Sequence, residues 1–282
     1  VCFNERRALA DTLHLKMLDL FKKYLIVGGL PDAVNAFLEQ HNVMAIRKVQ
    51  NDIYTLYGVD ASKYEQNHAR LKIQRIYGMI PSNLENKKKR VIAKNIENKM
   101  SSRMENYSDE FEYLVSAGIA LDVKAISRPS YPLIENSGKN LLKLYLNDVG
   151  LLTALFFKNN IQAIMQDVRS INLGSVYETV VAQELKAHGF DLYYYDNKKN
   201  GEVDYLIDDV EHLSVIPLEI KSGKDYTVHS ALVRFIGVDE YNNHQALVFS
   251  NEQKVYHKGD VTYLPIYYVM FFEFYVSAVG TL

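Results

Sequence analysis

The sequence predicts an α+β protein with several domains, because helical and strand patterns occupy different parts of the chain. Apolar residues recur at helical spacing over much of residues 1–118, whereas strand-like runs become frequent after that point. The last third alternates the two patterns in the order α-β-β-β-α-β. We therefore expect a helical segment over residues 1–62, a domain of helices and strands over 63–170 and an α/β domain over 171–282.

The N-terminal segment is expected to contain three helices. Gly28-Gly29 would end the first helix, and Pro31 would open the second, since proline is favoured at the first helical position. A third helical pattern covers residues 44–57. The residues expected on the apolar faces of the first two helices are Leu13, Met17, Leu20, Tyr24, Ala33, Val34, Phe37 and Leu38.

The middle domain has the outline of a winged helix, which is three helices followed by two strands. The first helix is expected at 71–77, where Gly78 and Pro81 would break it. Two more helices are expected at 87–100 and 106–117. The two strands, expected at 119–127 and 141–146, would form the wing.

A basic cluster opens the second of these helices. Lys87, Lys88, Lys89 and Arg90 could contact DNA phosphates, which would position the protein without selecting a sequence. Glutamates are interspersed along the same stretch, however, and a charged helix face is more often only solvated. Winged helices also dock proteins, so DNA and protein partners both stay open.

The α/β domain is expected to place charged side chains on one face of a hairpin. Residues 196–201 (DNKKNG) end in Asn-Gly, a strong signal for a hairpin turn, and a second polar turn covers 208–214. Because side chains alternate across a strand, Glu219 and Lys221 share one face. Asp204 lies on the preceding strand, and we expect it to approach Glu219 closely.

Two carboxylates at short range repel each other unless a cation lies between them. Their hard oxygen atoms suit Mg²⁺ or Mn²⁺, which can lower the pKa of a bound water and bind a phosphoryl oxygen. Lys221 would orient that water or neutralise charge on the phosphate. Glu178 would complete the metal-binding set with Asp204 and Glu219, and Glu184 is the alternative. The competing interpretation is a solvated strand face with an ordinary ion pair.

Three segments of this domain resemble the PD-(D/E)XK nuclease superfamily in their order. They are GSVYETVVAQEL (174–185), GEVDYLI (201–207) and IPLEIKSG (216–223), with Val203 where the motif has proline. The resemblance implies a restriction-endonuclease-like fold and metal-dependent cleavage of nucleic acid, with Glu178, Asp204, Glu219 and Lys221 as the catalytic residues. The alternative is a non-catalytic module that binds DNA or protein.

Two further segments resemble the C-terminal region of bacterial and archaeal AAA-type ATPases, in which a domain of unknown function follows the ATPase core. They are YLIVGGLP (24–31) and KLYLNDVGLL (143–152). The resemblance implies that residues 1–62 adjoin an ATPase region and that the longer protein binds ATP. The tripeptide Ser-Gly-Lys occurs at 137–139 and at 222–224 and resembles part of a phosphate-binding loop. Both copies lack the first glycine and the hydroxyl residue of that loop. We therefore expect ATP to bind only upstream of Val1.

The composition favours a protein of the cytoplasm without a membrane segment. Cys2 is the one cysteine, the net charge is −2, and the N-terminus has no long apolar leader. The apolar tail 264–280 contains Pro265 and Glu273, so we interpret it as a buried strand with a hydrophobic end.

Several tyrosines and histidines of the C-terminal domain are interpreted as structural rather than functional residues. Tyrosines 193–195 are interpreted as strand packing rather than as a base-stacking platform. His188, His229 and His257 are interpreted as surface or loop residues, because no metal-binding spacing joins them.

Overall fold

The structure, a computed structural model, divides into two compact units. It describes residues 2, 5–60, 67–136, 141–166, 168, 171–223, 226–241, 243 and 245–272. The first unit, called the sheet unit here, combines Val1–Leu18, Lys124–Lys139 and Glu184–Leu282. The second, called the helical unit, combines Asp19–Val123 and Asn140–Gln183. Both units are therefore built from segments that are distant in the sequence.

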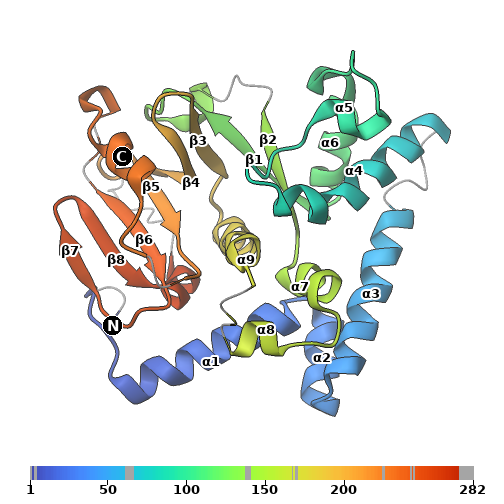
Figure 1. Ribbon diagram of the computed structural model, residues 1–282, viewed down its shortest axis with the longest axis horizontal. Helices are drawn as coiled ribbons and strands as arrows, with labels where there is room; N and C mark the ends of the chain where they lie inside the picture. Colours follow the sequence, from blue (N-terminus) through green and yellow to red (C-terminus); the bar gives the residue numbers. More distant parts are fainter. Residues whose placement is uncertain are drawn as a thin grey trace, which may run out of the picture. The chain divides into compact units, whose positions relative to one another are not determined.

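The helical unit contains most of the helices, which are labelled in Figure 1. Its elements are α1 (Asp11–Val27, which begins in the sheet unit), α2 (Pro31–Gln40), α3 (Val43–Asp60), α4 (Asn67–Glu85), α5 (Ala93–Glu97), η1 (Met104–Tyr107), α6 (Ser108–Ser116), β2 (Leu142–Leu146), α7 (Val149–Phe157), α8 (Gln162–Met165) and the first part of α9 (Gly174–Ala187). The expected N-terminal helical region is thus confirmed.

The buried faces of the first helices differ in part from the expected ones. Ala33 is buried, and Val34 and Phe37 pack against the same core cluster, as expected, whereas Leu38 is 60% exposed. In α1, Leu13 and Leu20 are also exposed. The spacing of apolar residues indicates a helix but does not fix which side of it packs when apolar residues lie on several sides.

Helix α4 is longer than the sequence indicates. It continues through Gly78 and Pro81 to Glu85, so the expected break is wrong. The physical reason is burial, since Ile80 and Leu84 continue the apolar face of the helix and are almost fully buried. Packing of that face outweighs the hydrogen bond that the proline lacks.

Segments 24–31 and 143–152 meet at Asp148 in the helical unit. The Asp148 side chain caps α7 by accepting a hydrogen bond from the Leu151 main-chain nitrogen, at 3.2 Å. It also accepts one from the main-chain nitrogen of Gly29, at 2.7 Å. Gly28 has a φ of +75°, and a Cβ atom there would lie 2.1 Å from an Asp148 oxygen. The Gly-Gly pair therefore ends α1 and makes room for this carboxylate.

Arg47 holds the ends of helices together in the same unit. Its buried guanidinium donates hydrogen bonds to the main-chain oxygens of Ile26 and Lys158, both at 2.9 Å, and to Gln50 Oε1 at 2.7 Å. Burial lowers the pKa of Arg47 to about 10. The guanidinium still carries its charge at neutral pH, where it stabilises main-chain oxygens at the C-terminal ends of α1 and α7.

The strands form one mixed eight-stranded sheet in the order β2-β1-β3-β4-β5-β6-β8-β7. The remaining elements are β1 (Ala120–Ile126), η2 (Leu133–Asn136), β3 (Tyr193–Asn197), β4 (Gly201–Asp209), β5 (Ser214–Ile220), α10 (Ser230–Ile236), η3 (Asp239–Tyr241), β6 (Ala246–Ser250), β7 (Tyr256–Lys258), β8 (Val261–Pro265) and η4 (Ile266–Phe271). The class is therefore α+β, as the sequence predicts.

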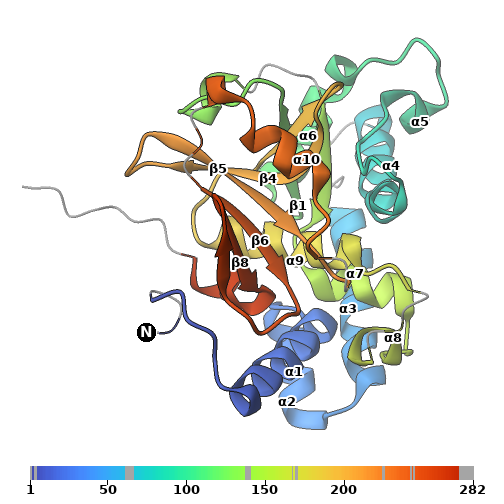
Figure 2. The same cartoon turned by 60° about the vertical axis from the view of Figure 1, so that its left-hand side comes forward.

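Strands β3, β4 and β5 are antiparallel neighbours, whereas β5, β6 and β8 run parallel. The hairpin expected at 196–201 joins β3 to β4 and is confirmed. The sequence indicated neither β7 nor the pairing of β7 with β8. Helix α10 lies across the sheet in Figure 2, where Leu232 and Phe235 belong to the same buried cluster as Leu206, Val248 and Tyr263.

The strands expected as a wing are β1 and β2, but β1 also pairs in parallel with β3. Both strands are thus part of the large sheet rather than an isolated two-stranded wing. Tyrosines 193–195 are buried in β3, as expected from strand packing.

The apolar C-terminal tail begins in a buried strand, as expected. Its first residues end β8 and continue into η4, and its positions 273–282 lie outside the described residues. Of the two Ser-Gly-Lys tripeptides, positions 137–139 and 224 also lie outside the described residues. Among the residues that are described, we find no helix with the length and apolar character needed to cross a membrane.

Candidate functional site

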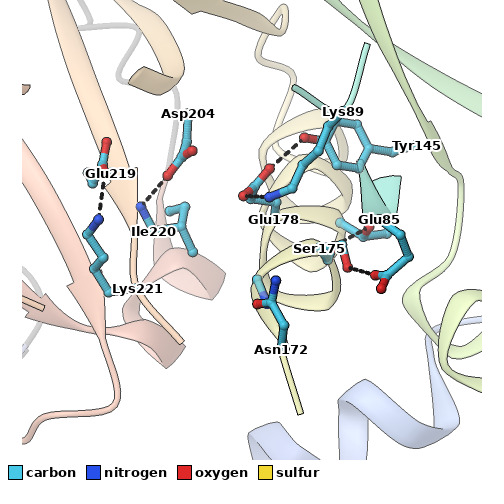
Figure 3. Close-up of polar contacts among 12 residues, drawn as sticks. Glu85, Lys89, Tyr145, Asn172, Ser175, Glu178, Asp204, Glu219, Ile220 and Lys221 are labelled. Carbon is cyan, nitrogen blue, oxygen red and sulfur yellow. Dashed lines mark hydrogen bonds and ion pairs between the residues drawn. The ribbon is translucent and has the colours of Figure 1, made fainter. Parts of the chain in front are cut away.

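Asp204 and Glu219 lie on adjacent strands of the sheet unit, as labelled in Figure 3. Tyr205 of β4 is paired with Leu218 of β5. Asp204 precedes Tyr205 and Glu219 follows Leu218, and the register of β4 against β3 shifts beside Asp204, between Tyr193 and Tyr195. Asp204 and Glu219, called the acidic pair below, therefore occupy the place at which the β4–β5 ladder ends.

The Asp204 carboxylate is oriented by the main chain of β5. Its Oδ2 atom accepts a hydrogen bond from the Ile220 nitrogen at 2.8 Å (Figure 3). Ile220 is the last residue of β5, so the side chain supplies an acceptor at the end of the strand pairing. This bond fixes the direction in which the Asp204 carboxylate points.

Lys221 forms an ion pair with Glu219, with 2.8 Å between Nζ and Oε1. The main-chain nitrogen of Lys221 donates to the oxygen of Phe249 at 2.9 Å, which ties this residue to β6. Glu219 is only 8% exposed, because both faces of β5 are buried. The expectation of one apolar and one charged face is therefore too simple for β5, where the carboxylate is largely enclosed.

The donor set of the acidic pair fits Mg²⁺ or Mn²⁺ in its chemistry. It offers carboxylate oxygens from two adjacent strands, and Mg²⁺ is often bound by one or two carboxylates with substrate phosphates and water as the other ligands. Across the described parts of the chain, no three His, Cys, Asp or Glu side chains are grouped to hold a metal. A cation at this place would thus depend on ligands beyond the acidic pair.

Glu178 lies on α9 within the helical unit, where basic and phenolic groups surround its carboxylate. It forms an ion pair with Lys89, and Tyr145 Oη donates a hydrogen bond to its Oε2 atom at 3.0 Å (Figure 3). Burial acts to raise the pKa of Glu178, but the charges of Lys89 and Lys143 and these hydrogen bonds hold the pKa below its ordinary value. Glu178 is thus an ionised carboxylate compensated by nearby lysines. The alternative residue, Glu184, is also buried on α9.

The basic cluster does not open a helix. Lys87, Lys88, Lys89 and Arg90 follow the end of α4 in a turn, and α5 begins only at Ala93. Lys87 and Lys88 are exposed, whereas Lys89 is turned towards Glu178 and has a left-handed φ of +50°. The expected helix is wrong because this turn serves the Lys89–Glu178 ion pair.

His229 is a buried residue that sequence reasoning placed at the surface or in a loop. It lies in the loop before α10, but its Nε2 atom is 2.6 Å from Tyr263 Oη and its ring is enclosed. Burial lowers the pKa of His229, and the charges of Lys221 and Lys258 lower it further. The imidazole is therefore neutral at neutral pH. Its partner lies on β8, so no local sequence signal indicated this contact.

Comparison with protein families gives two matches along the chain. Residues 18–162, just over half of the chain, match a domain of unknown function, DUF8612. Residues 173–269 match a second domain of unknown function, DUF4143. No curated protein and no solved structure matches the chain. The chain therefore belongs to the family of the domain of unknown function DUF8612.

Proposed function

We propose that this chain is an accessory region of an AAA-type ATP-binding protein and that its sheet unit acts on DNA with a divalent cation. The observation that carries the proposal is the acidic pair, which combines a carboxylate of β4 and one of β5, at the end of their pairing, with the adjacent Lys221. A restriction-endonuclease-like fold for residues 171–282 and a winged-helix-like role for residues 63–170 are parts of the same proposal.

In this proposal, Asp204 and Glu219 hold Mg²⁺ or Mn²⁺. The cation, when bound, would lower the pKa of a water molecule and polarise a phosphoryl oxygen. The Ile220 nitrogen keeps the Asp204 carboxylate oriented. Lys221, which neutralises Glu219 in the absence of a cation, would turn its ammonium group to the phosphate and offset the charge that develops there.

Glu178, the third carboxylate expected from the sequence, belongs to the helical unit and has Lys89 and Tyr145 as partners there, so the proposed cation site consists of the acidic pair. In the same proposal, the exposed Lys87 and Lys88 contact DNA phosphates, with Lys89 and Arg90 on the same turn.

Cleavage of supercoiled plasmid DNA with Mg²⁺ or Mn²⁺ tests the proposal. We expect the wild type to nick the plasmid, and we expect Asp204→Ala and Glu219→Gln to lose this activity, because each removes a carboxylate charge from the acidic pair. Glu211→Ala, which changes an exposed glutamate in the turn between β4 and β5, is the matched control and should cleave like the wild type. Equal cleavage by the wild type and Asp204→Ala would remove the proposal.

A second candidate is a non-catalytic module that binds DNA or protein and regulates the ATPase. The observation that favours it is that each carboxylate expected as a ligand already has an internal contact. Asp204 accepts from the main chain, Glu219 pairs with Lys221, and Glu178 pairs with Lys89. Salt-dependent DNA binding without cleavage in either cation would support this candidate, and no DNA binding at low salt would point to a protein interface.

The ATPase part of the proposal has a separate test. ATP would be bound by a segment other than residues 1–282, because these residues contain no phosphate-binding loop motif. We expect ATP hydrolysis by the longer protein and no ATP binding by residues 1–282 alone, measured by calorimetric titration. Tight ATP binding by residues 1–282 would contradict this assignment.

A further inference from the structure

A row of paired residues runs across the sheet unit from the acidic pair to the edge strand. Glu219 of β5 is paired with Val248 of β6, and Val248 is paired with Tyr263 of β8. Tyr263 is in turn paired with Tyr256 of β7, the last strand of the sheet. Since paired residues of adjoining strands project from the same face, the row carries the carboxylate and both tyrosines on one face.

Three tyrosines form a compact group at the far end of this row. The rings of Tyr256 and Tyr263 are stacked, with centroids 4.4 Å apart and planes 7° apart. Tyr226, in the loop that follows β5, meets Tyr263 edge-on with a centroid distance of 6.0 Å. Tyr263 is 2% exposed, whereas Tyr226 and Tyr256 are only half-buried. The tyrosine group, defined as these three residues, thus has a buried support and two accessible rings.

The buried Tyr263 ring is fixed by a hydrogen bond with His229, and two lysines lie near that histidine. His229 Nε2 lies 2.6 Å from Tyr263 Oη, so a hydrogen bond fixes the Tyr263 ring. The ammonium groups of Lys221 and Lys258 are close enough to His229 to lower its pKa. Burial, neighbouring tyrosines and the charge of Glu252 raise the pKa of Tyr256 to about 12, so its phenol stays neutral. Lys258 lies two residues after Tyr256 on β7.

We propose that the tyrosine group is a stacking surface for an unpaired base of a single-stranded nucleic acid. Aromatic rings stack with any base, while Lys258, on the same strand as Tyr256, attracts the phosphate backbone. Bases within a duplex are already stacked on each other, so this surface selects single-stranded over double-stranded nucleic acid. The inference deepens the proposed function by naming the substrate class, and it rests on that function only for the role of the acidic pair.

Fluorescence anisotropy with a labelled oligothymidylate tests this inference on residues 1–282. The titration is done in EDTA, so that cleavage plays no part and a failure of the nuclease proposal leaves the result interpretable. We expect the single strand to bind more tightly than a duplex of the same length. Tyr256→Leu and Tyr226→Leu should each weaken binding by about tenfold, because each removes one stacking ring.

Two controls separate stacking from folding. Tyr256→Phe keeps the ring and should bind within about twofold of the wild type, since stacking needs the π-face and not the hydroxyl group. Tyr131→Leu changes another half-buried tyrosine of the sheet unit, outside the tyrosine group, and should leave binding unchanged. Thermal unfolding of every variant checks that the fold is kept.

Photo-cross-linking of the wild type to a bromodeoxyuridine oligonucleotide provides a measurement that needs no variant. We expect the cross-links to map to Tyr226 or Tyr256. The inference is overturned if the duplex binds as tightly as the single strand, if the folded leucine variants bind like the wild type, or if the cross-links map only to other segments.

Discussion

Buried charged side chains in the helical unit depend on specific partners. Glu178 is 5% exposed and has Lys89 and Tyr145 as direct partners, with the Lys143 charge nearby. A charge removed from water is stable in a protein only when opposite charges and hydrogen bonds compensate it. Removing one member of such a group leaves the others uncompensated, which makes the cost of a substitution measurable.

Glu178→Gln is expected to destabilise the protein by about 3–5 kcal/mol at neutral pH, because it leaves buried lysine charge without a carboxylate. The pKa of Glu178 in the folded state lies below its ordinary value of 4.5. Its contribution is therefore present above pH 4.5 and is lost as the pH falls through the folded pKa. Urea unfolding of both proteins from neutral pH to below pH 4.5 measures the difference.

The matched control is Glu112→Gln, which changes an exposed glutamate of α6 and should alter stability by less than about 0.5 kcal/mol. A gap between wild type and Glu178→Gln that stays constant as the medium is acidified would contradict the ion-pair explanation.

At the scale of elements, the junction between α1 and α2 depends on a glycine that no other residue can replace without strain. Gly28→Ala puts a Cβ atom 2.1 Å from an Asp148 oxygen and requires a left-handed backbone. We expect it to lower the free energy of unfolding by at least about 2 kcal/mol.

Gly78→Ala is the opposite case within the same unit. Gly78 is an exposed residue inside α4, and a Cβ atom there meets nothing within 4 Å. The substitution should stabilise the protein by about 0.5–1 kcal/mol through lower chain entropy in the unfolded state. Thermal unfolding of the two variants side by side checks both signs, and destabilisation of similar size at both positions would refute the account of Gly28.

The elements that the sequence predicted well are those governed by local rules. Asn-Gly at the end of 196–201 led to the β3–β4 hairpin, and the alternation of side chains placed Glu219 and Lys221 together. The turn at 87–90 and the burial of His229 depend instead on Glu178 and Tyr263, which lie far along the chain. No local propensity carries that information, so these two features could not be predicted.

At the scale of the whole molecule, the family segments and the compact units divide the chain differently. The DUF4143 match begins at residue 173, whereas the sheet unit also contains Lys124–Lys139 from within the DUF8612 match. Strand β1 supplies residues paired with β3. A sheet unit without that strand would expose an unpaired edge and apolar surface.

We therefore expect residues 173–282, expressed alone, to unfold without a cooperative transition. Co-expression with residues 1–172 should restore a cooperative transition, because the missing strand is supplied in trans. Circular dichroism during heating measures both. Cooperative unfolding of residues 173–282 on their own would show that the DUF4143 segment is an independent folding unit and would contradict this account.

In the proposed function, Asp204 and Glu219 form a divalent-cation site beside Lys221. Its most direct test is Mn²⁺ titration followed by electron paramagnetic resonance, which counts bound ions without requiring any activity. We expect one site in the wild type that is lost in the Asp204→Asn, Glu219→Gln double variant and kept in Glu211→Ala. Equal Mn²⁺ binding by the wild type and the double variant, or no binding by the wild type, would contradict it.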